Sequence, residues 1–165
     1  LREVLDEVGV DATRYFFVMR RSDSHLDFDL ELAKQQSNEN PVYYIQYAHA
    51  RIRSVLRETE ARGIPLPDPA VLRGFEYASD EEKRLVATLD SFPKEVGKAS
   101  RELAPHVIAS YAYSLAGDFH SFYNAHRILG EEEKIVKARL LLVRATGIVL
   151  GSALRLLGVS APEKM

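Results

Sequence analysis

The stretch Glu39-Asn-Pro-Val-Tyr-Tyr-Ile-Gln-Tyr-Ala-His-Ala-Arg51 begins a helix whose first turn is clearly marked in this 165-residue sequence. Asn40 is a favourable N-cap, and Pro41 stands at the first helical position, where the missing N–H costs nothing. Side chains for one buried face then recur at three- and four-residue steps, at Val42, Ile45, His49, Ile52 and Leu56. We expect this helix to run to about Arg62 and to stop at Gly63.

The same periodicity extends over most of the remaining sequence. It predicts helices over residues 1–8, 11–21, 29–36, 80–90, 93–103, 106–128 and 131–157. Ser79 and Glu82 have the spacing of a capping box, and Asp29 and Asp11 are suitable caps for their helices. Pro93 is expected to separate the two helices on either side of it.

Two segments do not follow the helical pattern. The stretch from His25 to Leu30 alternates polar and apolar residues, which predicts a short strand or extended piece. Three prolines between Ile64 and Pro69 require a non-helical connection. The fold class is therefore all-α, a helical bundle over residues 39–165 with a small mixed N-terminal appendage over residues 1–38.

Composition narrows the classes of function. A net charge of −2 argues against a protein that coats nucleic acid through its overall field, so any nucleic-acid site must be a local patch. The absence of cysteine excludes disulfides and thiolate chemistry and fits a cytoplasmic setting. No apolar run approaches the ~20 residues of a membrane span, so no membrane partner is expected. Because the sequence opens with Leu1, we expect a piece of a longer protein.

Residues that could support catalysis are sparse. The five histidines are His25, His49, His106, His120 and His126. No pair has the i, i+4 spacing that places two imidazoles on one helix face for a metal, and we interpret them as surface or capping residues. The glycines form no phosphate-binding loop. We expect no catalytic residue, no cofactor and no metal in this chain.

Aromatic residues beside arginines give a more suggestive pattern. Tyr43, Tyr47 and Arg51 lie at successive i, i+4 steps, and Tyr123 and Arg127 repeat the spacing. A tyrosine ring can stack on an unpaired base, and an arginine can bind a base edge or a phosphate. The alternative is that these tyrosines are half-buried core residues with their hydroxyls at the rim. The spacing leaves both interpretations open.

The stretch from Glu39 to Arg51 closely resembles the hallmark sequence of arginyl-tRNA synthetases. Similar likeness is found in Glu7–Arg14, Asp23–Leu30, Ala138–Val143 and Leu156–Met165. That family comprises class I enzymes that join arginine to its tRNA using ATP with Mg²⁺. Neither signature motif of their nucleotide-binding fold, the His-Ile-Gly-His type or the Lys-Met-Ser-Lys type, is found here. The resemblance implies a C-terminal fragment that lacks the active site and is inactive alone. Residues 1–38 would then connect to the catalytic domain, and residues 39–165 would form a DALR-type anticodon-binding domain.

The resemblance also implies roles for particular residues. In the family, matching side chains receive unstacked anticodon-loop bases, and by position these are Tyr47, Arg51, Tyr123 and the closing Met165. Arg127 stands where some relatives carry another aromatic residue. Possible phosphate contacts are Arg53, Arg57, Arg127, Lys137 and Arg144. The implied partners are tRNA-Arg and the catalytic domain of the same polypeptide, with no DNA.

Two other functions remain as alternatives. One is the anticodon-binding domain of a related class I synthetase, such as that for cysteine, although the tyrosine-rich stretch from Glu39 to Arg51 favours arginine. The other is a helical protein-interaction domain without an RNA role, which the slightly acidic charge would suit. Titration with tRNA at several salt concentrations separates the second from the first.

Overall fold

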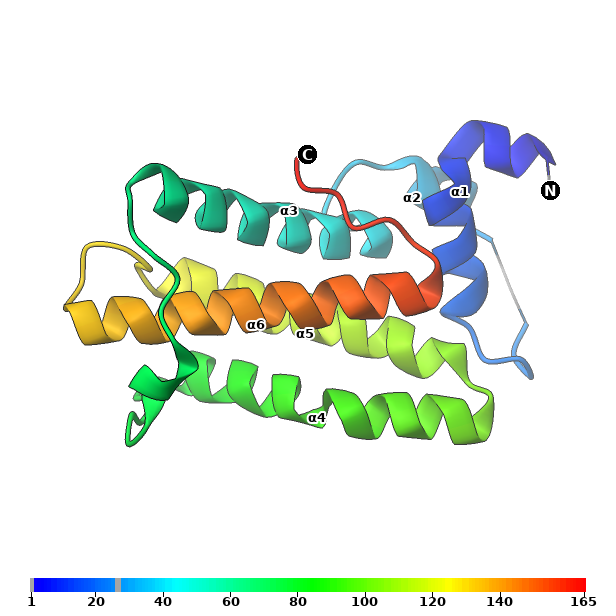
Figure 1. The fold of residues 1–165 in the computed structure, drawn as a ribbon. Coiled ribbons are helices and arrows are strands. Elements are labelled where there is room, and N and C mark those ends of the chain that lie inside the picture. The colour runs from blue at the N-terminus through cyan, green and yellow to red at the C-terminus, as the bar shows by residue number, and fades with distance from the viewer. Residues whose placement is uncertain (1, 26–27) are drawn as a thin grey trace.

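A computed structural model describes residues 2–25 and 28–165, and helices make up its regular structure (Figure 1). Their bounds are α1 (Arg2–Val18), α2 (Leu30–Lys34), α3 (Pro41–Ala61), the 3-10 turn η1 (Pro69–Leu72), α4 (Asp80–Glu102), α5 (Pro105–Ala125) and α6 (Glu133–Leu157). The all-α prediction is confirmed for these residues.

The mixed character expected of the N-terminal appendage is not found in its described residues. His25, Phe28 and Asp29 have no regular secondary structure, and α2 already begins at Leu30. The rest of the predicted strand, residues 26 and 27, lies outside the described part. Alternation over six residues is a weak indication of a strand, and here a helix cap overrides it. Asp29 caps α2 by accepting a hydrogen bond from the Leu32 backbone N–H at 2.9 Å, so a helix begins at the next residue.

Local capping chemistry explains where α3 and α4 begin. The Asn40 side chain accepts a hydrogen bond from the Val42 backbone N–H, with Pro41 in the first turn of α3. At the start of α4, Ser79 and Glu82 form the complete capping box. Gly9 divides α1 with φ 81° and ψ 168°, a backbone conformation that residues with a side chain rarely adopt.

The break predicted at Pro93 is wrong, because α4 continues through it from Asp80 to Glu102. An interior proline removes one helical hydrogen bond and crowds the preceding turn. Packing against α5 helps to hold the helix together at this defect. Tyr111 donates a hydrogen bond to the Thr88 carbonyl at 2.9 Å, and its ring lies 5.2 Å from that of Phe92.

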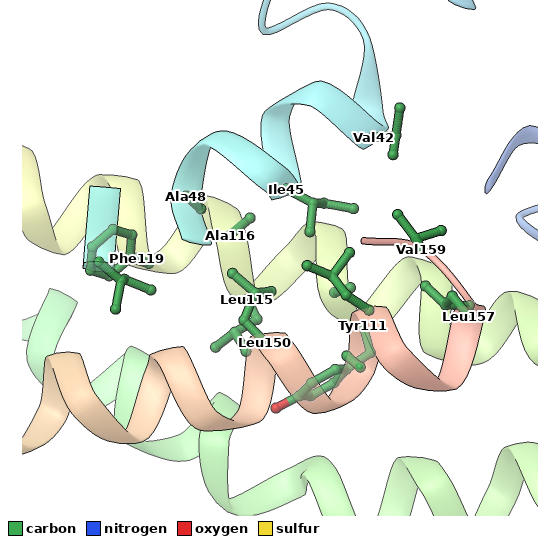
Figure 2. Close-up of a cluster of buried hydrophobic side chains, with 14 of the residues drawn as sticks. Val42, Ile45, Ala48, Tyr111, Leu115, Ala116, Phe119, Leu150, Leu157 and Val159 are labelled. Atoms are coloured by element: carbon green, nitrogen blue, oxygen red, sulfur yellow. The ribbon is translucent and has the colours of Figure 1, made fainter. Parts of the chain in front are cut away.

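The helices α5 and α6 form the middle of the bundle, with α3 on one side and α4 on the other (Figure 1). The core between α3, α5 and α6 contains Ile45, Leu115, Phe119 and Leu150, all fully buried (Figure 2). Burial of such side chains contributes ~1.5–3 kcal/mol each. This core fixes the face of α3 that meets α5.

By length and composition α6 could cross a membrane, but half of its most apolar window is buried inside the bundle. Its fully buried Leu140, Val143 and Leu154 belong to the core that α6 shares with α3 and α5. These are the properties of a central core helix, which must be apolar on most sides.

Residues before α3 pack against the bundle. Tyr15 of α1 is buried and donates a hydrogen bond to the Ala109 carbonyl of α5 at 3.2 Å. Arg14 reaches the Gly158 carbonyl at the end of α6 at 3.1 Å. The boundary expected near residues 38–41 therefore marks a change in the chain's course, while the two parts share contacts.

Candidate functional site

Two tyrosine rings and a guanidinium meet at the seam between α3 and α5. The Arg51 Cζ lies 4.6 Å from the centroid of the Tyr47 ring and 4.7 Å from that of Tyr123. Tyr43, one turn earlier on α3, stacks on Tyr47 with centroids 6.3 Å apart and planes 8° from parallel. The three predicted residues Tyr47, Arg51 and Tyr123 are half-buried and lie together. We call them the ring–guanidinium patch.

Hydrogen bonds hold the guanidinium within this patch. Arg51 donates from Nη2 to the Tyr47 hydroxyl at 2.6 Å and from Nη1 to His120 Nδ1 at 3.3 Å. A guanidinium has five N–H donors in a rigid fork, so these bonds leave others for a ligand. A cation over a ring contributes ~0.5–2 kcal/mol, which favours the observed position. The half-buried rings can offer their remaining exposed surface for stacking, and the guanidinium can offer a cationic donor for an acceptor edge.

His120 belongs to this site, although its sequence pattern did not single it out. The interpretation of His49 and His120 as surface or capping residues is wrong, because each is 7% exposed. The His120 ring lies 4.7 Å from that of Tyr44 and 5.8 Å from that of Tyr47. Burial lowers the pKa of His120, and the Arg51 guanidinium lowers it further, so the ring is neutral at pH 7. Its position three residues before Tyr123 was the available signal.

Residues 45–165 match the family described as the DALR anticodon binding domain. The chain belongs to this family. The DALR domain thus accounts for α3 from Ile45 onward and for all of the bundle that follows.

Similar proteins include arginine–tRNA ligases of two bacteria. The chain is 58% identical over 165 residues to an arginine–tRNA ligase of Carboxydothermus hydrogenoformans, covering 100% of this chain and 30% of that protein. It is 55% identical over 165 residues to an arginine–tRNA ligase of Desulforamulus reducens, covering 100% of this chain and 29% of that protein. The chain thus spans less than a third of the length of these relatives. The structure of Thermus thermophilus arginyl-tRNA synthetase superposes with a TM-score of 0.80 at 32% identity, over 96% of this chain and 27% of that one.

A second face of α3 in the DALR domain holds the C-terminal tail. Arg57 donates from Nη1 to the Glu163 carbonyl at 2.9 Å, and Arg53 forms an ion pair with the Glu163 carboxylate at 2.9 Å. His49 donates to the Pro162 carbonyl at 2.8 Å. Two predicted phosphate contacts, Arg53 and Arg57, therefore bind the tail and lie on a different face of α3 from the ring–guanidinium patch. The tail crosses α3 in Figure 1.

The other predicted residues are more dispersed. Met165 is 54% exposed at the end of the tail. Arg127 is exposed just beyond α5, and Lys137 pairs with Glu133 on α6. Arg144 is exposed on α6 beside a cavity of about 510 Å³. The structure brings Tyr47, Arg51 and Tyr123 together, whereas these cations are spread over the α5–α6 connection and α6.

The described residues 2–25 and 28–165 contain no group of three or more His, Asp or Glu side chains placed to hold a metal ion. The patch offers stacking and hydrogen bonding, the functions of a recognition surface.

Proposed function

We propose that this DALR domain recognises the anticodon loop of tRNA-Arg through the ring–guanidinium patch. An unpaired base stacks against Tyr47 or Tyr123, and Arg51 donates hydrogen bonds to an acceptor edge of that base. One observation carries the proposal: two rings and a guanidinium from separate helices converge within 4.7 Å at a half-exposed place. The family description and the names of the relatives support an anticodon and arginine tRNA as the target.

The domain serves a longer enzyme that joins arginine to tRNA in the cytoplasm, using ATP and Mg²⁺. Its relatives are more than three times as long as this chain, so the chemical step belongs to a catalytic domain outside it. Residues 39–165 form the anticodon-binding domain, and residues 1–38 connect it to that catalytic domain. Packing of α1 against α5 supports a firm connection between residues 1–38 and the anticodon-binding domain.

Affinity comes from local contacts because the overall charge is −2. Each stacked base contributes ~1–3 kcal/mol, and phosphate contacts add a term that weakens as salt rises. Arg127, Lys137 and Arg144 have side chains outside the tail contact and are suited to the phosphate role. Met165 follows the Glu163 anchor by two residues, so its main chain stays near the tail face of α3, and a contact from that side to the bound loop is part of the proposal.

The test is filter binding of arginine tRNA to the wild-type chain, Tyr47→Ala and the control Tyr113→Ala. Tyr113 is also a tyrosine of the α3–α5 side but is 45% exposed and lies outside the patch. We expect Tyr47→Ala to weaken binding by about 5- to 150-fold, the loss of one stacked base, with the helical fold intact. Tyr113→Ala should bind like the wild type. Normal affinity in Tyr47→Ala would rule out the assignment, and no salt-dependent binding by the wild type would favour a protein-interaction domain.

A further inference from the structure

His120 occupies an unusual position for a histidine in a helical core. It lies on α5 with 7% of its surface exposed, and rings of α3 lie against it at Tyr44 and Tyr47. Phe119 beside it is fully buried, with ring centroids 5.9 Å apart. Among such neighbours an apolar ring would pack equally well, so packing alone does not explain an imidazole.

The hydrogen-bond pattern determines its tautomer. A guanidinium can only donate, so Nδ1 accepts the bond from Arg51 Nη1 at 3.3 Å and the proton of the neutral ring is on Nε2. That Nε2 is buried and makes no hydrogen bond of normal geometry, although the Tyr44 backbone is close enough to interact with the ring. A buried unpaired N–H lowers stability, so the ring is retained at a cost to the fold. The benefit lies at Nδ1, the atom that meets Arg51.

We propose that His120 is the positioning residue of the ring–guanidinium patch, fixing the orientation in which Arg51 presents its free N–H donors to the base. The inference rests on the proposed recognition of the anticodon loop. The Tyr47 hydroxyl binds only Nη2, and the two rings contact the guanidinium without fixing the direction of its N–H groups. The second bond, from Nη1 to His120, removes this freedom, and a pre-oriented donor loses less entropy on binding.

Two variants separate this role from a structural one. His120→Asn places an amide oxygen where Nδ1 lies but removes the ring. His120→Phe keeps the ring between Tyr44 and Tyr47, removes the acceptor and also removes the unpaired Nε2–H. We therefore expect opposite rankings. The melting temperature of His120→Phe should equal or exceed that of the wild type. The melting temperature of His120→Asn should be lower than that of His120→Phe. The affinity of His120→Asn for arginine tRNA should stay within about threefold of the wild-type affinity. The affinity of His120→Phe should be about tenfold weaker, the value of one net hydrogen bond.

A pH series gives an independent measurement. The groups facing His120 from α3 are Arg51, Tyr44 and Tyr47, with Tyr123 beyond the guanidinium. Protonation of His120 would abolish the acceptor and place a second cation beside Arg51. Since its pKa lies below the ordinary 6.5, affinity should fall as pH decreases below 6.5. Acidification otherwise favours RNA binding by reducing negative charge, and His120→Asn reports that background. The ratio of the wild-type affinity to the His120→Asn affinity should therefore decrease as pH falls.

The outcomes distinguish the positioning role of His120 from the proposed recognition of the anticodon loop. A wild-type chain that fails to bind arginine tRNA overturns the proposed function itself. A wild type that binds, together with His120→Phe binding equally well, overturns the positioning role alone. The positioning role is also overturned if binding ranks the variants in the order of their stability, because that is the result of a purely structural histidine.

Discussion

Glu82 is the carboxylate most firmly built into the bundle, and its removal tests how the end of α5 is held. It is 4% exposed and accepts a hydrogen bond from Arg139 Nε at 2.8 Å. Arg139 also donates to the Arg127 carbonyl at 2.7 Å, and its Nη2 lies 3.2 Å from His126 Nδ1. The pair therefore joins α4, α6 and the connection that follows Tyr123.

We predict that Glu82→Gln lowers the free energy of unfolding by about 3 kcal/mol at pH 7, the lower end for breaking one partner of a buried ion pair. The loss stays at the lower end because the amide oxygen still accepts hydrogen bonds and Arg139 keeps the Arg127 carbonyl. For a domain of this size the melting temperature should fall by about 6–12 °C.

The pH dependence of this loss has a definite sign. Burial alone would raise the pKa of Glu82, but hydrogen bonds from Arg139 and the Ser79 backbone N–H outweigh it and keep the pKa below the ordinary 4.5. A depressed carboxyl pKa adds stability that is fully present above the unfolded value and is lost as pH falls through the folded value. The wild-type advantage over Glu82→Gln should thus be constant near neutrality and shrink below about pH 4.5.

Denaturant unfolding of the wild type and Glu82→Gln at pH 7 and pH 4 measures both quantities. Asp80→Asn is the matched control, since Asp80 lies in the same first turn of α4 but is exposed. It should cost less than about 1 kcal/mol. A Glu82→Gln loss no larger than that of Asp80→Asn, or a difference that does not change with pH, would refute the reasoning.

Two further predictions concern the face where α3 meets α6 and the tail. A Cβ at Gly147 would lie 2.8 Å from Ile52 Cγ2, whereas a Cβ at Gly151 would make an ordinary contact at 3.4 Å. In denaturant unfolding, Gly147→Ala should therefore be less stable than Gly151→Ala by about 1–3 kcal/mol. Equal stability of the two variants would contradict the close approach at Gly147. Arg57→Ala should change the free energy of unfolding by less than about 1 kcal/mol. It should speed carboxypeptidase digestion of the tail, because it removes the hydrogen bond to the Glu163 carbonyl. An unchanged digestion rate would show that this bond does not hold the tail.

The helix starts were predictable because they depend on residues close in sequence. Asn40 with Pro41 and Ser79 with Glu82 satisfy their first-turn N–H groups through side chains within three residues. The failure at Pro93 has the opposite origin. Its local cost is outweighed by contacts between α4 and α5, such as Tyr111 with Thr88, which are distant in sequence. Local rules therefore located the ends of helices more reliably than their interruptions.

The same division applies to the site. Tyr47 and Arg51 were predictable as neighbours because four residues bring side chains onto one helix face. Arg53 lies two residues beyond Arg51, ~200° around the helix axis, so its placement on the tail face could have been read from the sequence. The contribution of α5 depends on which of its faces meets α3. Tyr123 was selected from family likeness, and His120 was missed although it lies three residues before Tyr123 on the same helix.

The way Arg51 is held leaves a positive charge available at one place on a chain whose net charge is −2. Arg53 and Arg139 each pair with a carboxylate, which offsets their charge locally. The hydrogen-bond partners of Arg51 are a tyrosine hydroxyl and an imidazole, and burial keeps that imidazole neutral. Neutral partners fix the guanidinium without neutralising it, so its positive charge remains available to an acceptor on a base or phosphate. A carboxylate at position 120 would hold Arg51 equally well but would remove that charge, which gives a physical reason for a neutral acceptor there.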